Sequence, residues 1–123
     1  MQTRSLLSEA EDVQGVKLIT ANMGAVGADA LRAVCDTLRD LDANVAAILA
    51  GVDGAKVTFA VAVGKGAQQK GLNAGKLAKE AATAAGGNGG GRPDFAMAGG
   101  KKPELVADAL AAAKALAVSL IAP

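Results

Sequence analysis

The sequence lacks histidine, tryptophan and tyrosine, and it contains one cysteine and two phenylalanines among its 123 residues. Without histidine and with a single thiol, the chain cannot form an imidazole or thiolate zinc site, an internal disulfide, or a catalytic site that uses imidazole. Cys35 falls on the apolar stripe of a predicted helix, so we expect a small buried side chain there rather than a reactive thiol. These absences exclude every catalytic mechanism that depends on histidine for this chain.

Long apolar runs and aromatic side chains are also scarce. No apolar run approaches the roughly 20 residues that span a bilayer, and the first residues (MQTRSLLSEAED) lack the pattern of a signal peptide. Aromatic residues make up 2% of the chain, which removes the usual stacking platforms for single-stranded nucleic acid. We therefore expect a soluble, cytoplasmic protein with no membrane partner, whose aliphatic core includes Phe59 and Phe95.

Charge is distributed unevenly, although the net charge is only +1. Residues 1–64 hold five basic and eight acidic residues, whereas residues 65–102 hold seven basic residues against Glu80 and Asp94. The seven basic residues are Lys65, Lys70, Lys76, Lys79, Arg92, Lys101 and Lys102. Such a patch either neutralises the phosphates of a partner or is an ordinary solvated face. Charge by itself is compatible with both interpretations.

Apolar periodicity divides the chain into the strands and helices of one α/β domain. The predicted order is a strand at 16–23, a helix ending at 41, strands at 45–50 and 57–63, a helix at 74–85, a short strand at 94–98 and a helix at 103–120. We predict a single domain in two or three layers, with a small mixed or parallel sheet of about four to five strands packed with three helices. The domain is expected to span residues 15–123, and residues 1–14 to form an N-terminal arm or the tail of a preceding helix.

Turn and capping residues mark several boundaries of these elements. The sequence Gly51-Val52-Asp53-Gly54 predicts a turn between two strands. Asn73 is expected to cap the helix that begins at Ala74, and Gly86 to end it. Pro103 occupies the first-turn position that proline prefers in a helix.

A glycine-rich segment, GGNGGGRPDFAMAGG at residues 86–100, contains seven glycines. A flexible linker would separate two bodies with their own cores, but the residues after Lys102 amount to a single helix. The segment therefore lies inside the domain, where glycines permit positive φ angles and close approach of the backbone to another surface.

Known nucleotide-binding patterns do not account for this segment. Gly64-Lys65 and Gly100-Lys101 lack the spacing of a phosphate-binding loop, and a dinucleotide fingerprint would follow a strand rather than a helix. The acidic residues are scattered, so we predict neither catalytic residues nor a metal site. Asp94 is expected to act structurally, in a cap, a turn or an ion pair with Arg92.

The same segment resembles the signature GGGGGGRPDxAQAGG of the C-terminal, DHH-associated domain family of alanyl-tRNA synthetases. The similarity extends upstream through VTFAVAVGKGAQQKGLNAGKLAKEAATAAGG and the strand and helix of residues 16–41, so it covers nearly the whole chain. Two departures are Asn88, which interrupts the glycine run, and Met97, which replaces the usual Gln. A phosphoesterase branch of the superfamily carries a GGGH-like motif, which a chain without histidine does not match.

The resemblance implies a non-catalytic domain of a large ligase. In the family, ATP-dependent aminoacylation and zinc-dependent editing reside in other domains, so ATP, magnesium and zinc are implied for the parent enzyme and no cofactor for this chain. The expected partners are tRNA(Ala), bound at the elbow where the D and T loops meet, and the other domains of the synthetase. A homodimer is a further expectation from the family.

We predict that RNA is contacted by backbone amides of residues 86–91 together with the basic patch. The candidate RNA-binding residues are Lys65, Lys70, Lys76, Lys79, Gly89, Gly90, Gly91, Arg92, Lys101 and Lys102. In the alternative interpretation, the glycines only allow close packing, and the domain is a dimerisation or structural module with little tRNA affinity of its own.

Overall fold

The computed structural model describes residues 10–121, which fold into six strands, four α-helices and one 3-10 turn. In chain order the elements are β1 (Glu11–Val13), β2 (Val16–Asn22), α2 (Ala28–Leu41), β3 (Val45–Asp53), β4 (Lys56–Val63), α3 (Lys65–Gln69), α4 (Ala74–Ala84), β5 (Asn88–Gly91), β6 (Phe95–Gly100), η1 (Pro103–Leu105) and α5 (Val106–Ile121). The predicted α/β class is confirmed, with more strands than the four or five expected and one more helix than three.

The strands form one open, mixed sheet in the order β1-β2-β3-β4-β6-β5. β2 and β3 run parallel and are connected through α2, and every other neighbouring pair is antiparallel. β5, which is made almost entirely of glycine, therefore lies at one edge of the sheet, and β1 lies at the other.

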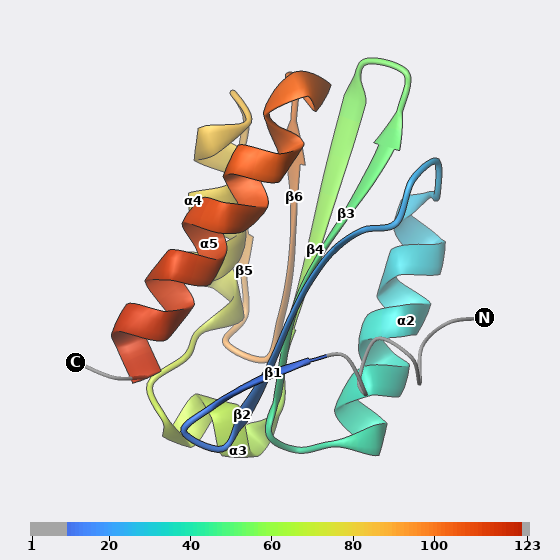
Figure 1. The fold of residues 1–123 in the computed structure, drawn as a ribbon. Coiled ribbons are helices and arrows are strands. Elements are labelled where there is room, and N and C mark those ends of the chain that lie inside the picture. The colour runs from blue at the N-terminus through green and yellow to red at the C-terminus, as the bar shows by residue number, and fades with distance from the viewer. Residues whose placement is uncertain (1–9, 122–123) are drawn as a thin grey trace.

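Helices cover both faces of this sheet, which gives three layers. Figure 1 shows α2 on one face and α4 with α5 side by side on the other. α2 begins without a side-chain cap, and its buried side chains recur at the three- and four-residue spacing of an amphipathic helix, at Leu31, Val34, Cys35 and Leu38. The predicted position of Cys35 inside the core is confirmed.

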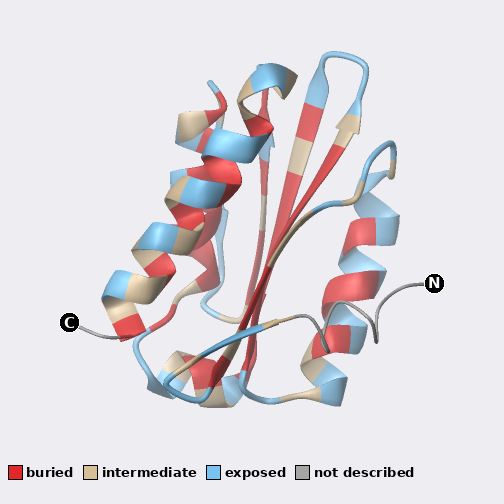
Figure 2. Ribbon diagram, viewed as in Figure 1, coloured by how far each residue is buried: buried red, intermediate tan, exposed pale blue. Residues whose placement is uncertain are grey.

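β4 divides the core into two clusters because its two faces differ in bulk. Val57, Phe59, Val61 and Val63 point into the larger cluster beneath α4 and α5, whereas Ala60 and Ala62 point toward α2. Figure 2 shows the buried residues concentrated in the central strands and on the inner faces of the helices. Small alanine side chains allow a helix to pack closely on the sheet, as the alternation in the sequence predicted.

Both predicted caps of α4 are present. Asn73 Oδ1 accepts a hydrogen bond from the Lys76 amide at 3.1 Å. At the other end Gly86 has a φ of 76°, and the amides of Gly86 and Gly87 donate to the carbonyls of Thr83 and Ala82. This pair of bonds is a Schellman motif, which requires a residue that tolerates a left-handed conformation at Gly86.

Several boundaries differ from those predicted. β3 continues through Gly51 to Asp53, so the turn of this hairpin falls at Gly54 and Ala55 rather than across residues 51–54. Gly51 pairs with Thr58 within the strand, and glycine is required there because a Cβ would lie 2.6 Å from the Val26 carbonyl oxygen. The sequence prediction also missed the short helix α3, and it placed the start of the last helix at Pro103, where the chain first forms η1.

The N-terminal region is described from residue 10 onward. Glu11–Val13, inside the predicted arm, pair with β2 as the edge strand β1. The Lys114 ammonium group of α5 forms an ion pair with Glu11 at 2.8 Å, which joins this edge to the helical layer. The prediction for residues 1–9 lies outside the described residues.

Candidate nucleic-acid interface

The glycine-rich segment folds into a hairpin of β5 and β6, with Arg92, Pro93 and Asp94 between the strands. The glycine run, for which the sequence analysis predicted no strand, is thus an edge strand, and the sequence does not reveal it because glycine is depleted in strands. Its tip is fixed to α4, since the Ala74 amide donates to the Pro93 carbonyl oxygen at 2.9 Å. The Gly91 carbonyl oxygen lies so close to Gly75 that a Cβ on Gly75 would be 2.5 Å away.

Most glycines of the segment are required by packing. A Cβ at Gly87 would collide with the Gly99 carbonyl oxygen, one at Gly89 with Ala98, and one at Gly91 would lie 2.7 Å from the Ala96 Cβ. Gly100 is similarly confined, with the Ala85 Cβ at 2.9 Å. These four residues let β5 lie tightly against β6 and let the hairpin lie tightly against α4.

Fewer amides of residues 86–91 are available for binding than the sequence indicated. The amides of Gly86 and Gly87 already donate within the cap of α4, so these two cannot also bind a phosphate. The Arg92 amide donates to the Phe95 carbonyl oxygen at 3.1 Å. Along a strand of an antiparallel pair, successive amides point alternately toward the partner strand and away from it. From that alternation we expect the amides of Gly89 and Gly91 to point toward the open edge of the sheet.

The structure separates the basic residues predicted to form one patch. Lys101 and Lys102 follow β6 at the end of the hairpin near the α4 cap, where both amides donate to the Ala85 carbonyl oxygen. Arg92 lies at the opposite end, at the hairpin tip, and Lys76 is in the first turn of α4 beside it. The remaining three lie on exposed surface of α4 or at the ends of α3: Lys65, Lys70 and Lys79.

A cavity of about 490 Å³ opens beside Lys101, and we call it the basic end pocket. Its lining consists of Lys56, Val57, Gly86, Gly87, Asn88, Gly99, Gly100 and Lys101. The methylene groups of the Lys102 side chain lie against Gly86, 3.2 Å from the position a Cβ would take, so a third lysine side chain adjoins the pocket. The pocket thus combines lysines with exposed glycine backbone and contains no acidic lining residue.

Lys56 was not among the predicted site residues. It lies in the acidic N-terminal half of the sequence, and only the pairing of β4 with β6 brings it to the glycine hairpin. Lys56 lies outside the basic cluster of residues 65–102, so the local charge of the sequence does not indicate it. The turn signal after β3 was the available clue, because it places Lys56 at the start of β4. The end of any strand that pairs antiparallel with β4 lies next to that position.

A second cavity, of about 710 Å³, lies at the other end of the sheet and carries mixed charge. Its lining includes Lys65, Gln68, Asp36, Asp40 and the ion pair of Arg39 with Asp94. Acidic groups at this cavity oppose a polyanion, so it is a weaker candidate for RNA than the basic end pocket.

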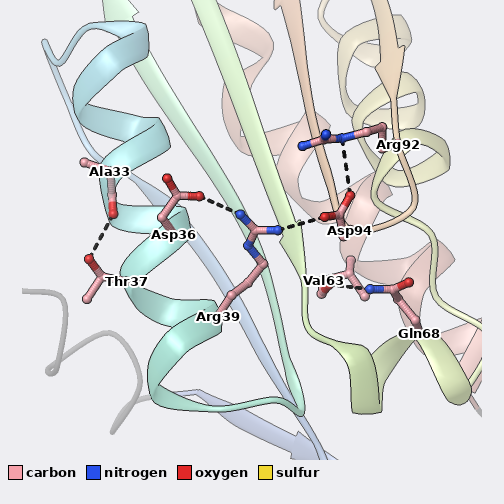
Figure 3. A network of polar contacts seen from close by, with 8 residues as sticks. All are labelled: Ala33, Asp36, Thr37, Arg39, Val63, Gln68, Arg92 and Asp94. Atoms are coloured by element: carbon pink, nitrogen blue, oxygen red, sulfur yellow. Dashed lines mark hydrogen bonds and ion pairs between the residues drawn. The ribbon is translucent and has the colours of Figure 1, made fainter.

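Asp94 ties the hairpin tip to α2, as Figure 3 shows. Its carboxylate accepts a hydrogen bond from Arg39 Nη1 at 3.1 Å and lies 3.5 Å from Arg92 Nε. Arg39 also pairs with Asp36, and its guanidinium lies over the Phe95 ring. The predicted structural role of Asp94 and its pairing with Arg92 are confirmed, but the stronger partner, Arg39, was missed.

Other candidate chemistry is sparse in the described part of the chain. Burial raises the pKa of the Cys35 thiol to about 12, so this group stays protonated at neutral pH. Within residues 10–121, no three His, Cys, Asp or Glu side chains are grouped as the ligands of a metal ion would be. None of the helices between residues 10 and 121 is long and apolar enough to span a membrane.

Comparison with known proteins defines the class to which this three-layer fold belongs. The DHHA1 domain family model matches residues 15–119, and the chain therefore belongs to the DHHA1 domain family. Within that class it is similar to the C-Ala domain of Aquifex aeolicus alanyl-tRNA synthetase, whose crystal structure matches with a TM-score of 0.79 and 28% identity. The match covers 94% of this chain and 99% of that domain.

Curated relatives support the same conclusion. The alanine-tRNA ligase of Carboxydothermus hydrogenoformans is 44% identical over 110 residues, which cover 89% of this chain and 12% of the ligase. The corresponding ligase of Bacillus subtilis is 40% identical over 111 residues, which cover 90% of this chain and 13% of the ligase. The chain thus spans about an eighth of the length of the enzymes that it matches.

Proposed function

We propose that this chain is a non-catalytic tRNA-binding domain of an alanine-tRNA ligase, and that it binds the elbow of tRNA(Ala). The basic end pocket carries the proposal, because it joins three lysines to exposed backbone in a domain similar to a synthetase domain. Folded RNA presents phosphates and 2′-hydroxyls that are recognised by shape, so this surface needs no aromatic platform.

The proposed role within the parent enzyme is to hold the tRNA while other domains act on it. Aminoacylation with ATP and magnesium, and zinc-dependent editing, would belong to those other domains. Residues of the hairpin would bind the RNA at a distance from the catalytic centres. The parent enzyme would act in the cytoplasm. The amides of Lys101 and Lys102 both donate to the Ala85 carbonyl oxygen, which fixes the backbone here, and both lysines are exposed at the end of β6.

The salt dependence of tRNA affinity tests this proposal. Titration of labelled tRNA(Ala) with the 123-residue chain at several salt concentrations gives the slope of log K against log salt. Each lysine that contacts a phosphate contributes about one to this slope, so Lys56→Ala with Lys101→Ala should reduce it by about two. Lys114→Ala is a matched control, because it removes a lysine that lies on α5 and pairs with Glu11.

Three results would contradict the proposal: undetectable binding, a flat salt plot, or equal effects of the control and the pocket variants. If the chain fails to bind tRNA and sedimentation shows a concentration-dependent dimer, the dimerisation module is the correct interpretation.

A further inference from the structure

The two faces of the glycine hairpin differ in a way that packing does not explain. Side chains of β6 alternate, so that Ala96 and Ala98 enter the cluster beneath α4, whereas Phe95 and Met97 lie on the face of α2. Asn88 and Gly90 of β5 pair with Gly99 and Met97, so these residues also lie on the α2 face. The glycines confined by contacts, Gly89 and Gly91, lie on the α4 face.

Gly99 is the clearest exception among the glycines of the hairpin. A Cβ at this position would meet only the Val57 carbonyl oxygen, at 3.7 Å, which is an ordinary van der Waals separation. The φ of Gly99 lies outside the left-handed region, and the residue is exposed although it lies within the paired part of β6. A β-branched residue would favour a strand here, so neither folding nor conformation accounts for glycine.

The surroundings of this bare face are cationic. Lys56 and Lys101 line the pocket at the Gly99 end, and Arg92 extends from the hairpin tip at the other. Arg32 of α2 is exposed, its guanidinium lies 5.6 Å from the centroid of the Phe95 ring, and it forms no ion pair within residues 10–121. Among the acidic residues on this side, Asp36 and Asp94 are both paired with Arg39, whereas Asp53 is the register partner of Lys56 and Asp29 lies three positions before Arg32 on α2.

We infer that the α2 face of the β5–β6 hairpin is a second contact surface for RNA, on which the sugar–phosphate backbone lies directly against the bare strand at Gly99 while Arg32 binds it from α2. This inference rests on the proposed function and deepens it, because it specifies which face of the hairpin meets the RNA. The absence of a side chain at Gly99 allows close approach to the strand at this position, and the flanking cations complement a polyanion.

A bulky residue at Gly99 should block the contact while preserving the fold. In the same tRNA titration, Gly99→Val should lower affinity by about tenfold or more, because the isopropyl group stands where the RNA backbone lies. The salt slope should stay unchanged, because no charge is lost, and the thermal midpoint should hold or rise. Arg32→Gln should lower both the affinity and, by about one, the slope.

Ala111→Val is the matched control, because it adds similar bulk to an exposed position of α5 on the opposite side of the sheet. Full affinity in a folded Gly99→Val variant would overturn the inference and leave the proposed function intact. If the valine variant does not fold, Gly99→Ala and Arg32→Gln decide, and unchanged binding in both would overturn it. Absence of binding by the unmodified chain would contradict the proposed function itself.

Discussion

Arg39 and Asp94 show how single residues hold the hairpin in place from across the sheet. Arg39 is mostly buried, with 23% of its side chain exposed, and it links Asp36 on α2 to Asp94 on the hairpin. Pairs of this exposure contribute at most about 1 kcal/mol each, so their value lies in geometry more than in stability. The arrangement fixes the hairpin tip, and with it Arg92, relative to α2.

Cys35 provides a prediction at the residue scale. Burial raises the pKa of its thiol to about 12, whereas an unfolded thiol ionises with a pKa of about 8.5. The protonated thiol therefore contributes fully below the unfolded pKa, and its contribution falls as the pH rises toward the folded pKa. Between pH 8 and pH 10 we expect this residue alone to lower the free energy of unfolding by about 1–2 kcal/mol.

Urea unfolding at both pH values checks this expectation. Cys35→Ala should be less stable at pH 8 because it leaves a small cavity, but it should lose less stability on going to pH 10. A thiol reagent should label the native protein far more slowly than the unfolded chain. Identical pH slopes for the two proteins, or rapid native labelling, would refute the buried assignment.

At the scale of elements, β5 is the part of the fold that departs most from sequence rules. Glycine has a low strand propensity, yet four residues with three glycines pair with β6 along their whole length. The explanation is steric, because β6 lies too close to β5 for Gly89 and Gly91 to carry side chains on the α4 face. Packing density, rather than propensity, selects the residues of this strand.

A methyl group added to each face of the hairpin tests this explanation. Gly89→Ala would drive a Cβ into Ala98 and should lower the free energy of unfolding by about 3 kcal/mol or prevent folding. Gly99→Ala adds the same methyl group to the open face and should change stability by about 0.5 kcal/mol or less, or raise it. Chemical denaturation of both variants is the measurement, and equal losses would contradict the assignment of the two faces.

Much of the fold was predictable because local signals coincide with the observed elements. The amphipathic pattern of α2, the alternation in β4 and the Asn73 cap each act within one element, so the sequence alone reveals them. The site was less predictable, because β4 brings Lys56 to the hairpin and Arg39 reaches Asp94 across 55 positions of sequence. Contacts between distant segments depend on strand order, which periodicity does not specify.

At the scale of the whole molecule, the mixed sheet separates two tasks. The α4 and α5 side holds the larger core, which the confined glycines of the hairpin help to close. The hairpin and its flanking cations, joined at one edge of the sheet, remain exposed for a partner. A stable scaffold thus presents a basic, side-chain-poor edge, which suits an RNA surface recognised by shape.

Footprinting of tRNA(Ala) with the 123-residue chain tests the central claim most directly. Hydroxyl radicals cleave exposed riboses, so bound positions are protected in proportion to occupancy. We predict protection confined to the D and T loops at the elbow, and its loss when Lys56 and Lys101 are replaced by alanine. An unprotected elbow, or protection confined to the acceptor or anticodon stem, would contradict the account.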